Sequence, residues 1–300
     1  MMRKVNGKDV VRIKGTRVMK SRIKYSYISE GVVFIGAITI VVALKLFNCD
    51  IGNGGPKIAY DVSINLMAAS VLAFIFELLG DKMVMNKDML RERDSILRVD
   101  ALVRPICQRF SLLYIQLSNA DLDKVRSICD SAFRSGNIIE GMPETFAISE
   151  MVNMFMPSMF IGGSFQRPVV EEFFEQEHRI VDEFSMALRI NEFTLFPEIK
   201  KIMMEFVGCC STMLCEKAIV DATRMTVGKV NFSEMMTKWL KDGTVQKFYN
   251  NIAAGKQDPT GNLMSDYVRL YEKMKKERAI LVRYDKAIQE LRQSVVALSA

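Results

Sequence analysis

Two long apolar stretches near the amino terminus dominate the hydropathy pattern of this chain. They cover residues 28–47 and 58–79, and each is about as long as a helix that crosses a bilayer core of roughly 30 Å. The residues between them, 48–57, read NCDIGNGGPK, a run of turn formers. This pattern predicts two membrane-spanning helices joined by a short loop, that is, a transmembrane helical hairpin.

Basic residues flank this predicted hairpin on both outer sides. The leader, residues 1–27, holds nine lysines and arginines against one acid, Asp9. Five more basic residues follow between positions 82 and 98, whereas the connecting loop holds only Lys57. Because positively charged flanks stay in the cytoplasm, both chain ends are predicted to be cytoplasmic, with Cys49 in the outer loop. A lone cysteine there could cross-link two subunits or stay free.

The net charge of +6 is concentrated in this leader. It suits anionic lipid of the inner leaflet, where each basic residue contributes on the order of 1 kcal/mol. Nucleic acid attracts the same charges, but the only aromatic residues of the leader are Tyr25 and Tyr27, at the predicted membrane edge. No direct nucleic-acid binding is therefore expected.

The apolar stretches allow two other interpretations. Glu30 and Lys45 border the uncharged part of the first stretch, and the second contains Asp61, Asn65 and Glu77. A buried helical hairpin of a soluble protein has the same pattern, and this alternative stays open. A cleaved signal peptide is disfavoured, because no small-x-small cleavage site follows the first stretch and a second apolar stretch comes directly after it.

The rest of the chain has helical periodicity almost throughout, so the predicted fold class is all-α. A juxtamembrane helix is expected over 81–118, continuing from the second apolar stretch, with Pro105 as a kink, restart or hinge. A helical cytoplasmic domain is expected over 119–261 and a long amphipathic helix over 262–300. Within the domain the predicted helices cover 121–135, 143–155, 169–190, 198–225, 232–241 and 244–254.

The last predicted helix carries an apolar stripe with alternating spacings of three and four residues, as in a coiled coil. This stripe is predicted to pack on the helical domain or on a partner protein. Its residues are Leu281, Tyr284, Ile288, Leu291 and Val295.

The predicted membrane helices carry polar and small residues at regular spacing. On the second helix these recur every four residues: Asp61, Asn65, Ala69, Ala73 and Glu77. On the first helix a close-packing face is expected at Gly36, Thr39 and Ala43. One interpretation packs the two stripes against each other within one hairpin. The other brings the second helices of several chains together around a common axis, and the two are compatible.

Chemical motifs are scarce. His178 is the only histidine, which excludes zinc motifs built on paired histidines, and no phosphate-binding glycine loop or nucleophile elbow occurs. Glu171, Glu175, His178 and Asp182 share one helical face that could ligate a metal, but a di-iron bundle needs its E-x-x-H motif twice. A solvated acidic face is the simpler interpretation. The cysteines in VGCCSTMLC, residues 207–215, are expected to be buried, so neither an enzyme nor a cofactor is predicted.

An amino-terminal two-span hairpin followed by a helical cytoplasmic body resembles the two-transmembrane effectors of bacterial anti-phage defence, including those attached to retrons. The resemblance implies a toxin-like protein of the bacterial inner membrane, non-enzymatic and oligomeric. Its body would be held by a partner, for a retron the reverse transcriptase with its RNA–DNA hybrid, and release would let the hairpin permeabilise the membrane. The alternative is a membrane-anchored adaptor or sensor whose helical body binds a cytoplasmic protein.

Overall fold

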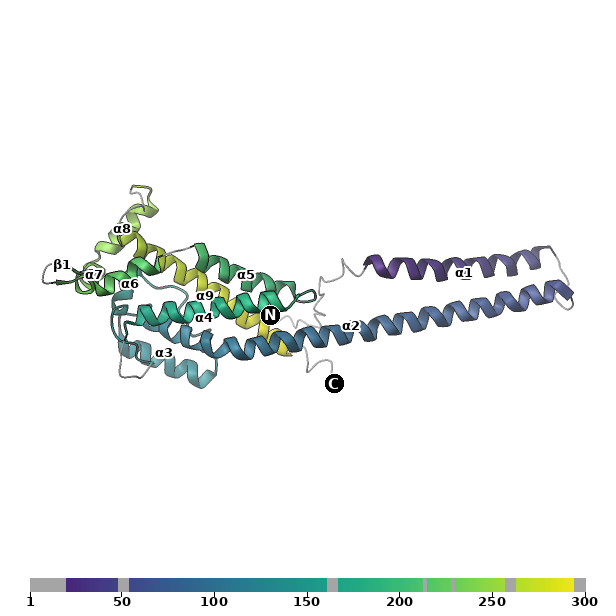
Figure 1. The fold of residues 1–300 in the computed structure, drawn as a ribbon, viewed down its shortest axis with the longest axis horizontal. Helices are drawn as coiled ribbons and strands as arrows, with labels where there is room; N and C mark the ends of the chain where they lie inside the picture. Colours follow the sequence, from purple (N-terminus) through teal and green to yellow (C-terminus); the bar gives the residue numbers. More distant parts are fainter. Residues whose placement is uncertain are drawn as a thin grey trace, which may run out of the picture. The chain divides into compact units, whose positions relative to one another are not determined.

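The structure, a computed structural model, describes residues 20–47, 54–160, 167–212, 215–227, 230–256 and 263–293. Cys49, Val295 and most of the basic leader lie outside the described residues. The described chain is helical apart from one antiparallel pair of two-residue strands, β1 (Thr226–Val227) and β2 (Val230–Asn231) (Figure 1). This confirms the all-α prediction. The chain divides between Glu92 and Arg93 into an amino-terminal unit and a second unit, here called the helical body.

The amino-terminal unit contains helix α1 (Lys20–Leu46) and the first part of helix α2 (Gly54–Leu117). Helix α2 begins four residues earlier than the predicted span and runs without interruption into the predicted juxtamembrane helix. Among the described residues, α2 is the one helix found to be long and apolar enough to cross a membrane, so the first predicted span, 28–47, stays a prediction. Only 11% of its most apolar 18-residue window is buried.

Pro105 lies inside α2 without ending it. The interpretation that the helix restarts there is therefore wrong. A proline removes the hydrogen bond to the carbonyl four residues earlier, here that of Ala101. Both Ala101 and Pro105 are exposed, so water can bind that carbonyl and the helix tolerates the proline. A role of Pro105 as a hinge stays a prediction.

Helix α3 (Leu122–Ser135) shows how local sequence signals position an element. The Asp121 carboxylate accepts hydrogen bonds from the backbone N–H groups of Asp123 at 2.9 Å and Lys124 at 3.4 Å, which caps the helix start. Gly136 ends the helix in the left-handed conformation, with φ of 73°. The predicted helix over 121–135 is confirmed.

The remaining predicted helices fall into two groups. Three are confirmed to within one residue: α4 (Val169–Ile190), α7 (Phe232–Lys241) and α8 (Thr244–Ala253). Two predictions are wrong. The segment around 143–155 contains only a short 3₁₀ helix, η1 (Ile148–Asn153), and the stretch 198–225 forms two helices, α5 (Pro197–Thr212) and α6 (Glu216–Arg224).

The long helix α9 (Leu263–Gln293) packs on α5, and α5 packs on α4 (Figure 1). The predicted apolar stripe of α9 faces this core: Leu281, Tyr284, Ile288 and Leu291 are all buried. Burial of side chains of this size stabilises the fold by about 1.5–3 kcal/mol each. Of the two predicted locations for this stripe, the body and a partner, the described part is thus packed on the body.

Aromatic rings from four helices join at the centre of the helical body. Phe110 of α2 lies 4.6 Å from Phe173 of α4 between ring centroids, and Phe184 of α4 lies 5.6 Å from Phe206 of α5. Tyr284 of α9 completes the group, 5.0 Å from Phe184. The carboxyl-terminal part of α2 is therefore part of the core of the body.

Candidate functional site

Apart from Glu77, the predicted polar stripe of α2 does not face α1. Asp61, Asn65, Ala69 and Ala73 are exposed, and only Glu77 is half-buried. On α1 the predicted close-packing residues Gly36 and Thr39 are also exposed, and Ala43 is half-buried. The interpretation that the two stripes pack against each other is therefore wrong. A spacing of four residues turns each successive position by about 40° around the axis, so the stripe leaves any single face.

The contact between α1 and the first part of α2 uses positions seven residues apart. On α1 these are Glu30, Ala37 and Leu44, and on α2 they are Ser63, Ser70 and Glu77. Ala37 and Ser63 are each 2% exposed. A cavity of about 250 Å³ lies beside them, lined by Glu30, Gly31, Phe34, Ser70, Val71 and Phe74. A spacing of seven keeps residues on one helix face, and the small side chains allow close approach.

Asp61 and Asn65 consequently lie on a face of α2 that α1 does not cover. Among the described residues neither side chain has a hydrogen-bond or ion-pair partner. Their neighbours on the helix surface, Val62, Ile64 and Leu66, are exposed apolar side chains. Asp61 and Asn65 thus lie on an otherwise apolar surface. If this surface is buried away from water, both side chains need hydrogen-bond partners.

The four residues of the predicted E-x-x-H face do not converge. Glu175 pairs with Arg167 at 2.9 Å, and the His178 Nε2 atom lies 2.8 Å from Glu216 of α6. Glu171 accepts a hydrogen bond from the Thr223 hydroxyl at 2.8 Å, and Asp182 is exposed. The histidine side chain itself is 57% exposed. This arrangement is a solvated polar face, which was the favoured interpretation.

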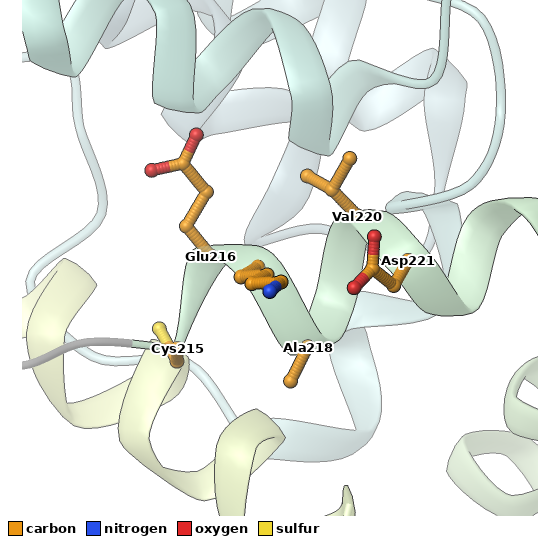
Figure 2. A pocket seen from close by; sticks show the side chains of 6 residues that line it. Cys215, Glu216, Ala218, Val220 and Asp221 are labelled. Atoms are coloured by element: carbon orange, nitrogen blue, oxygen red, sulfur yellow. The ribbon is translucent and has the colours of Figure 1, made fainter.

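A pocket of about 710 Å³ opens beside the start of α6 (Figure 2). Its lining comes from one short segment and brings no set of polar groups together around a common point. It carries no chemistry by itself. The lining residues are Cys215, Glu216, Lys217, Ala218, Val220 and Asp221.

A cluster of buried charges inside the body was not predicted from the sequence. Glu177 of α4, Lys273 and Glu277 of α9 are 2%, 3% and 0% exposed. The Lys273 Nζ atom lies 2.6 Å from a Glu177 carboxylate oxygen and 3.8 Å from one of Glu277. The Cys210 thiol of α5 donates to Glu277 at 3.4 Å. We call these four residues the buried charge cluster.

The donor atoms of Glu177, Cys210 and Glu277 lie within 4.8 Å of one another, a spacing that could suit a metal ion. However, the Lys273 ammonium donates a hydrogen bond to Glu177 and lies within ion-pair distance of Glu277. Burial tends to lower the pKa of Lys273, but Glu277 and Glu177 outweigh it and the net shift is upward. Because a positive charge already pairs with both carboxylates, we interpret the cluster as an ion-pair site.

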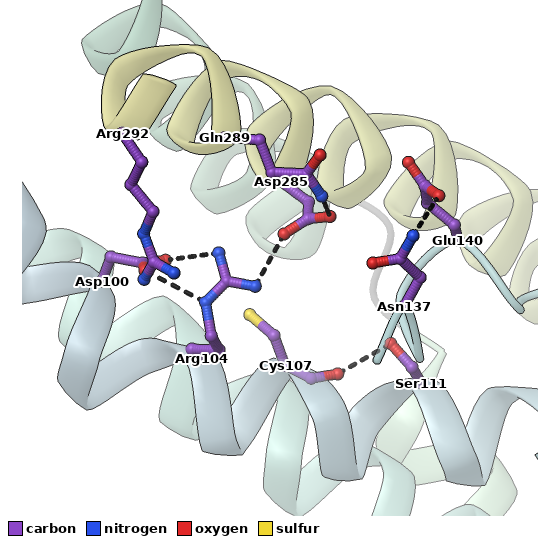
Figure 3. Close-up of polar contacts among 9 residues, drawn as sticks. All are labelled: Asp100, Arg104, Cys107, Ser111, Asn137, Glu140, Asp285, Gln289 and Arg292. Carbon is purple, nitrogen blue, oxygen red and sulfur yellow. Dashed lines mark hydrogen bonds and ion pairs between the residues drawn. The ribbon is translucent and has the colours of Figure 1, made fainter. Parts of the chain in front are cut away.

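A second network joins α2 to α9 (Figure 3). Arg104 donates to Asp100 at 3.1 Å and to Asp285 of α9 at 2.8 Å. Arg292 reaches Asp100 at 2.5 Å, and Gln289 donates to Asp285 at 2.7 Å. The Asp100 and Asp285 side chains are almost completely buried. These bonds fasten the last helix of the body to the helix that comes from the amino-terminal unit.

The cysteines of the body are not reactive nucleophiles. Burial raises the pKa of the Cys209 thiol to about 11 and that of Cys215 to about 12. Burial also raises the pKa of Cys107 and Cys210 strongly. At neutral pH these groups stay protonated, whereas thiol catalysis needs the thiolate. They act as small apolar side chains.

Comparison of the chain with protein-family models, with curated proteins and with solved structures finds no match.

Proposed function

We propose that this protein is a non-enzymatic membrane effector, in which α1 and the first part of α2 form a transmembrane hairpin and the helical body controls it. The observation that carries the proposal is the uncovered apolar surface of these two helices. Most of the exposed large apolar side chains of the described chain lie between Val32 and Leu90. Transfer of each such side chain out of water is favourable by about 1.5–3 kcal/mol, and lipid is the solvent that fits the two helices.

The basic flanks of the hairpin support an orientation with both ends in the cytoplasm of a bacterial cell. The body, which begins at Arg93, would then be cytoplasmic and within reach of a regulatory partner protein. A reverse transcriptase with its RNA–DNA hybrid is the partner that the resemblance to retron effectors suggests. Release from that partner would be the trigger.

Asp61 and Asn65 favour an effector over an anchor, because a helix that only anchors the chain does not need polar side chains on its exposed face. An ionised Asp that faces lipid costs on the order of 3 kcal/mol at the bilayer centre. Asp61 lies near the outer end of the predicted span 58–79, where this cost is smaller, and Asn65 lies one turn deeper. Because α1 packs on another face of α2, these groups would need a second copy of the chain or water to satisfy them. Several α2 helices with Asp61 and Asn65 turned toward a shared axis would line a polar path through the membrane.

A first experiment tests the membrane arrangement. Cys49 is expected to react with a membrane-impermeant thiol reagent in intact spheroplasts, because the proposed orientation puts it on the outer side of the membrane. Native Cys107 is unsuitable as the inside control, since it is 0% exposed and unreactive on either side. A Lys286→Cys variant, exposed on α9, provides that control and should be labelled only after lysis. Labelling of position 286 in intact spheroplasts, or a fully soluble protein, would refute the arrangement.

A second experiment tests the effector activity. Cells expressing the chain without a partner should lose membrane potential, measured with a voltage-sensitive dye. The double variant Asp61→Leu, Asn65→Leu should insert in the membrane and leave the potential intact. The matched control, Ile58→Leu with Val62→Leu, changes two exposed apolar positions of the same helix and should depolarise like the wild type. Equal depolarisation by the Asp61/Asn65 variant would refute the effector proposal.

A membrane-anchored adaptor is the second candidate. A pocket of about 880 Å³ opens among α3, η1 and α7. It carries both apolar and charged side chains, and protein–protein interfaces combine an apolar core with a polar rim in the same way. Its lining includes Leu122, Phe155, Met156, Glu234, Lys238 and Asp242. A chain that binds a protein through this pocket and never depolarises the membrane would be an adaptor.

A further inference from the structure

The buried charge cluster contains two carboxylates but only one ammonium group. Glu177, Lys273 and Glu277 are all at least 97% buried. With both carboxylates ionised and the ammonium charged, the cluster has a net charge of −1. An uncompensated charge in a protein interior is costly, and such groups normally neutralise.

The hydrogen bonds of the cluster indicate where an additional proton would bind. One oxygen of each carboxylate, Oε2 of Glu177 and Oε2 of Glu277, is buried without a hydrogen-bond donor. A carboxylate oxygen of Glu177 and one of Glu277 lie within 4.8 Å of each other. Two ionised carboxylates this close in a protein interior repel, whereas a proton bound to one of them supplies a missing donor and removes the excess charge.

We propose that Glu177 and Glu277 form a single buried proton-binding site that stabilises the packing of α9 on α4 and α5. Loss of this proton destabilises that packing. The inference does not rest on the membrane function proposed above. It concerns the stability of the body in any surroundings.

The groups facing the site agree with this assignment. Helix α4 contributes Glu177, α5 contributes Cys209 and Cys210, and α6 is preceded by Cys215. Helix α9 contributes Lys273 and Glu277, with Asp266 and Lys276 farther along it. Burial, and after it the charge of Glu177, raises the pKa of Glu277 well above its usual value, and Lys273 opposes this only in part.

The direction of the pH effect follows from this shift. The folded body binds the Glu277 proton more tightly than the unfolded chain does. The resulting stability is complete below the unfolded pKa, about 4.5, and is lost as the pH rises through the folded pKa. Within that window the folding equilibrium constant should fall by roughly tenfold for each pH unit.

The main test compares denaturant unfolding of the full chain in detergent micelles between about pH 5 and about pH 9. In the Glu277→Gln variant the amide replaces the protonated acid, so the wild type should lose stability relative to it as the pH rises. Glu290→Gln, exposed on the same helix, is the matched control and should follow the wild type. Parallel pH profiles of wild type and Glu277→Gln would overturn the proposal.

Infrared spectroscopy gives a readout independent of unfolding. The folded wild type at neutral pH should show the carbonyl band of a protonated carboxylic acid, and both Glu177→Gln and Glu277→Gln should lose it. Absence of that band in the wild type would overturn the proposal. So would zinc titration that stabilises the wild type at one ion per chain and has no effect on Glu277→Gln, because the pair would then bind a metal ion.

Discussion

Replacing Lys273 with methionine removes the ammonium that lies between Glu177 and Glu277 while keeping an unbranched side chain to fill the space. If Glu277 carries a proton, one ionised carboxylate, that of Glu177, is left buried without its cation. Removal of one partner of a buried ion pair costs about 3–5 kcal/mol, and we expect a loss of this size.

The assay is equilibrium unfolding of the full chain in detergent, followed by the fluorescence of Trp239, the only tryptophan of the sequence. This residue lies on α7 against Phe232, at 6.4 Å between ring centroids, and therefore reports on the body. Lys286→Met, exposed on α9, is the matched control and should change stability by less than about 0.5 kcal/mol. The triple variant Glu177→Leu, Lys273→Met, Glu277→Leu should recover most of the loss. If Lys273→Met unfolds like Lys286→Met, the charges of the cluster are not coupled in the way argued here.

Three further changes test other parts of the body. Arg104→Met leaves Asp285 without its cation and Asp100 with Arg292 alone, so the free energy of unfolding should fall by about 3 kcal/mol. In the same denaturation assay Arg98→Met, a change at an exposed position of α2, should have little effect. Asp121→Ala should lose about 1 kcal/mol by removing the cap of α3, and Asp121→Asn should retain most of it; equal losses would argue against capping. Ile288→Asp with Leu291→Asp should unfold the body, seen as loss of cooperative Trp239 unfolding, because both positions are buried in its core; a folded double variant would contradict this packing.

Local sequence signals predicted several elements closely. Helix α4 begins directly after Pro168 and α3 directly after Asp121, since the residues that favour a helix start act within one turn. The break between α5 and α6 left no comparable signal, because VGCCSTMLC keeps a helical apolar pattern across the point where the chain leaves the helix. The position of the break between α5 and α6 depends on how segments distant in the sequence pack together.

The face on which α1 meets α2 was predictable with the right spacing. Ser63, Ser70 and Glu77 lie seven residues apart, as do Glu30, Ala37 and Leu44. The spacing of four used for Asp61 and Asn65 mixes several faces of the helix. It therefore identified polar residues correctly but assigned them the wrong neighbour.

The buried charge cluster also had a signal in the sequence. Glu177 stands in the apolar stripe of α4 between Phe173 and Ile180, and Glu277 stands in that of α9 between Met274 and Leu281. A charged residue at a core position of one helix predicts a partner at the same level of a neighbouring helix. The sequence alone does not indicate which helices are neighbours, so this pattern could not pair Glu177 with Lys273 and Glu277.

The central claim is that the first two helices of this chain permeabilise a membrane through the face that carries Asp61 and Asn65. The most direct measurement is release of a fluorescent dye from lipid vesicles reconstituted with the purified full chain. The wild type and the Ile58→Leu, Val62→Leu control should release the dye at equal protein density, and the Asp61→Leu, Asn65→Leu variant should retain it. Vesicles that keep the dye with inserted wild-type protein, or lose it equally with the Asp61/Asn65 variant, would contradict the account.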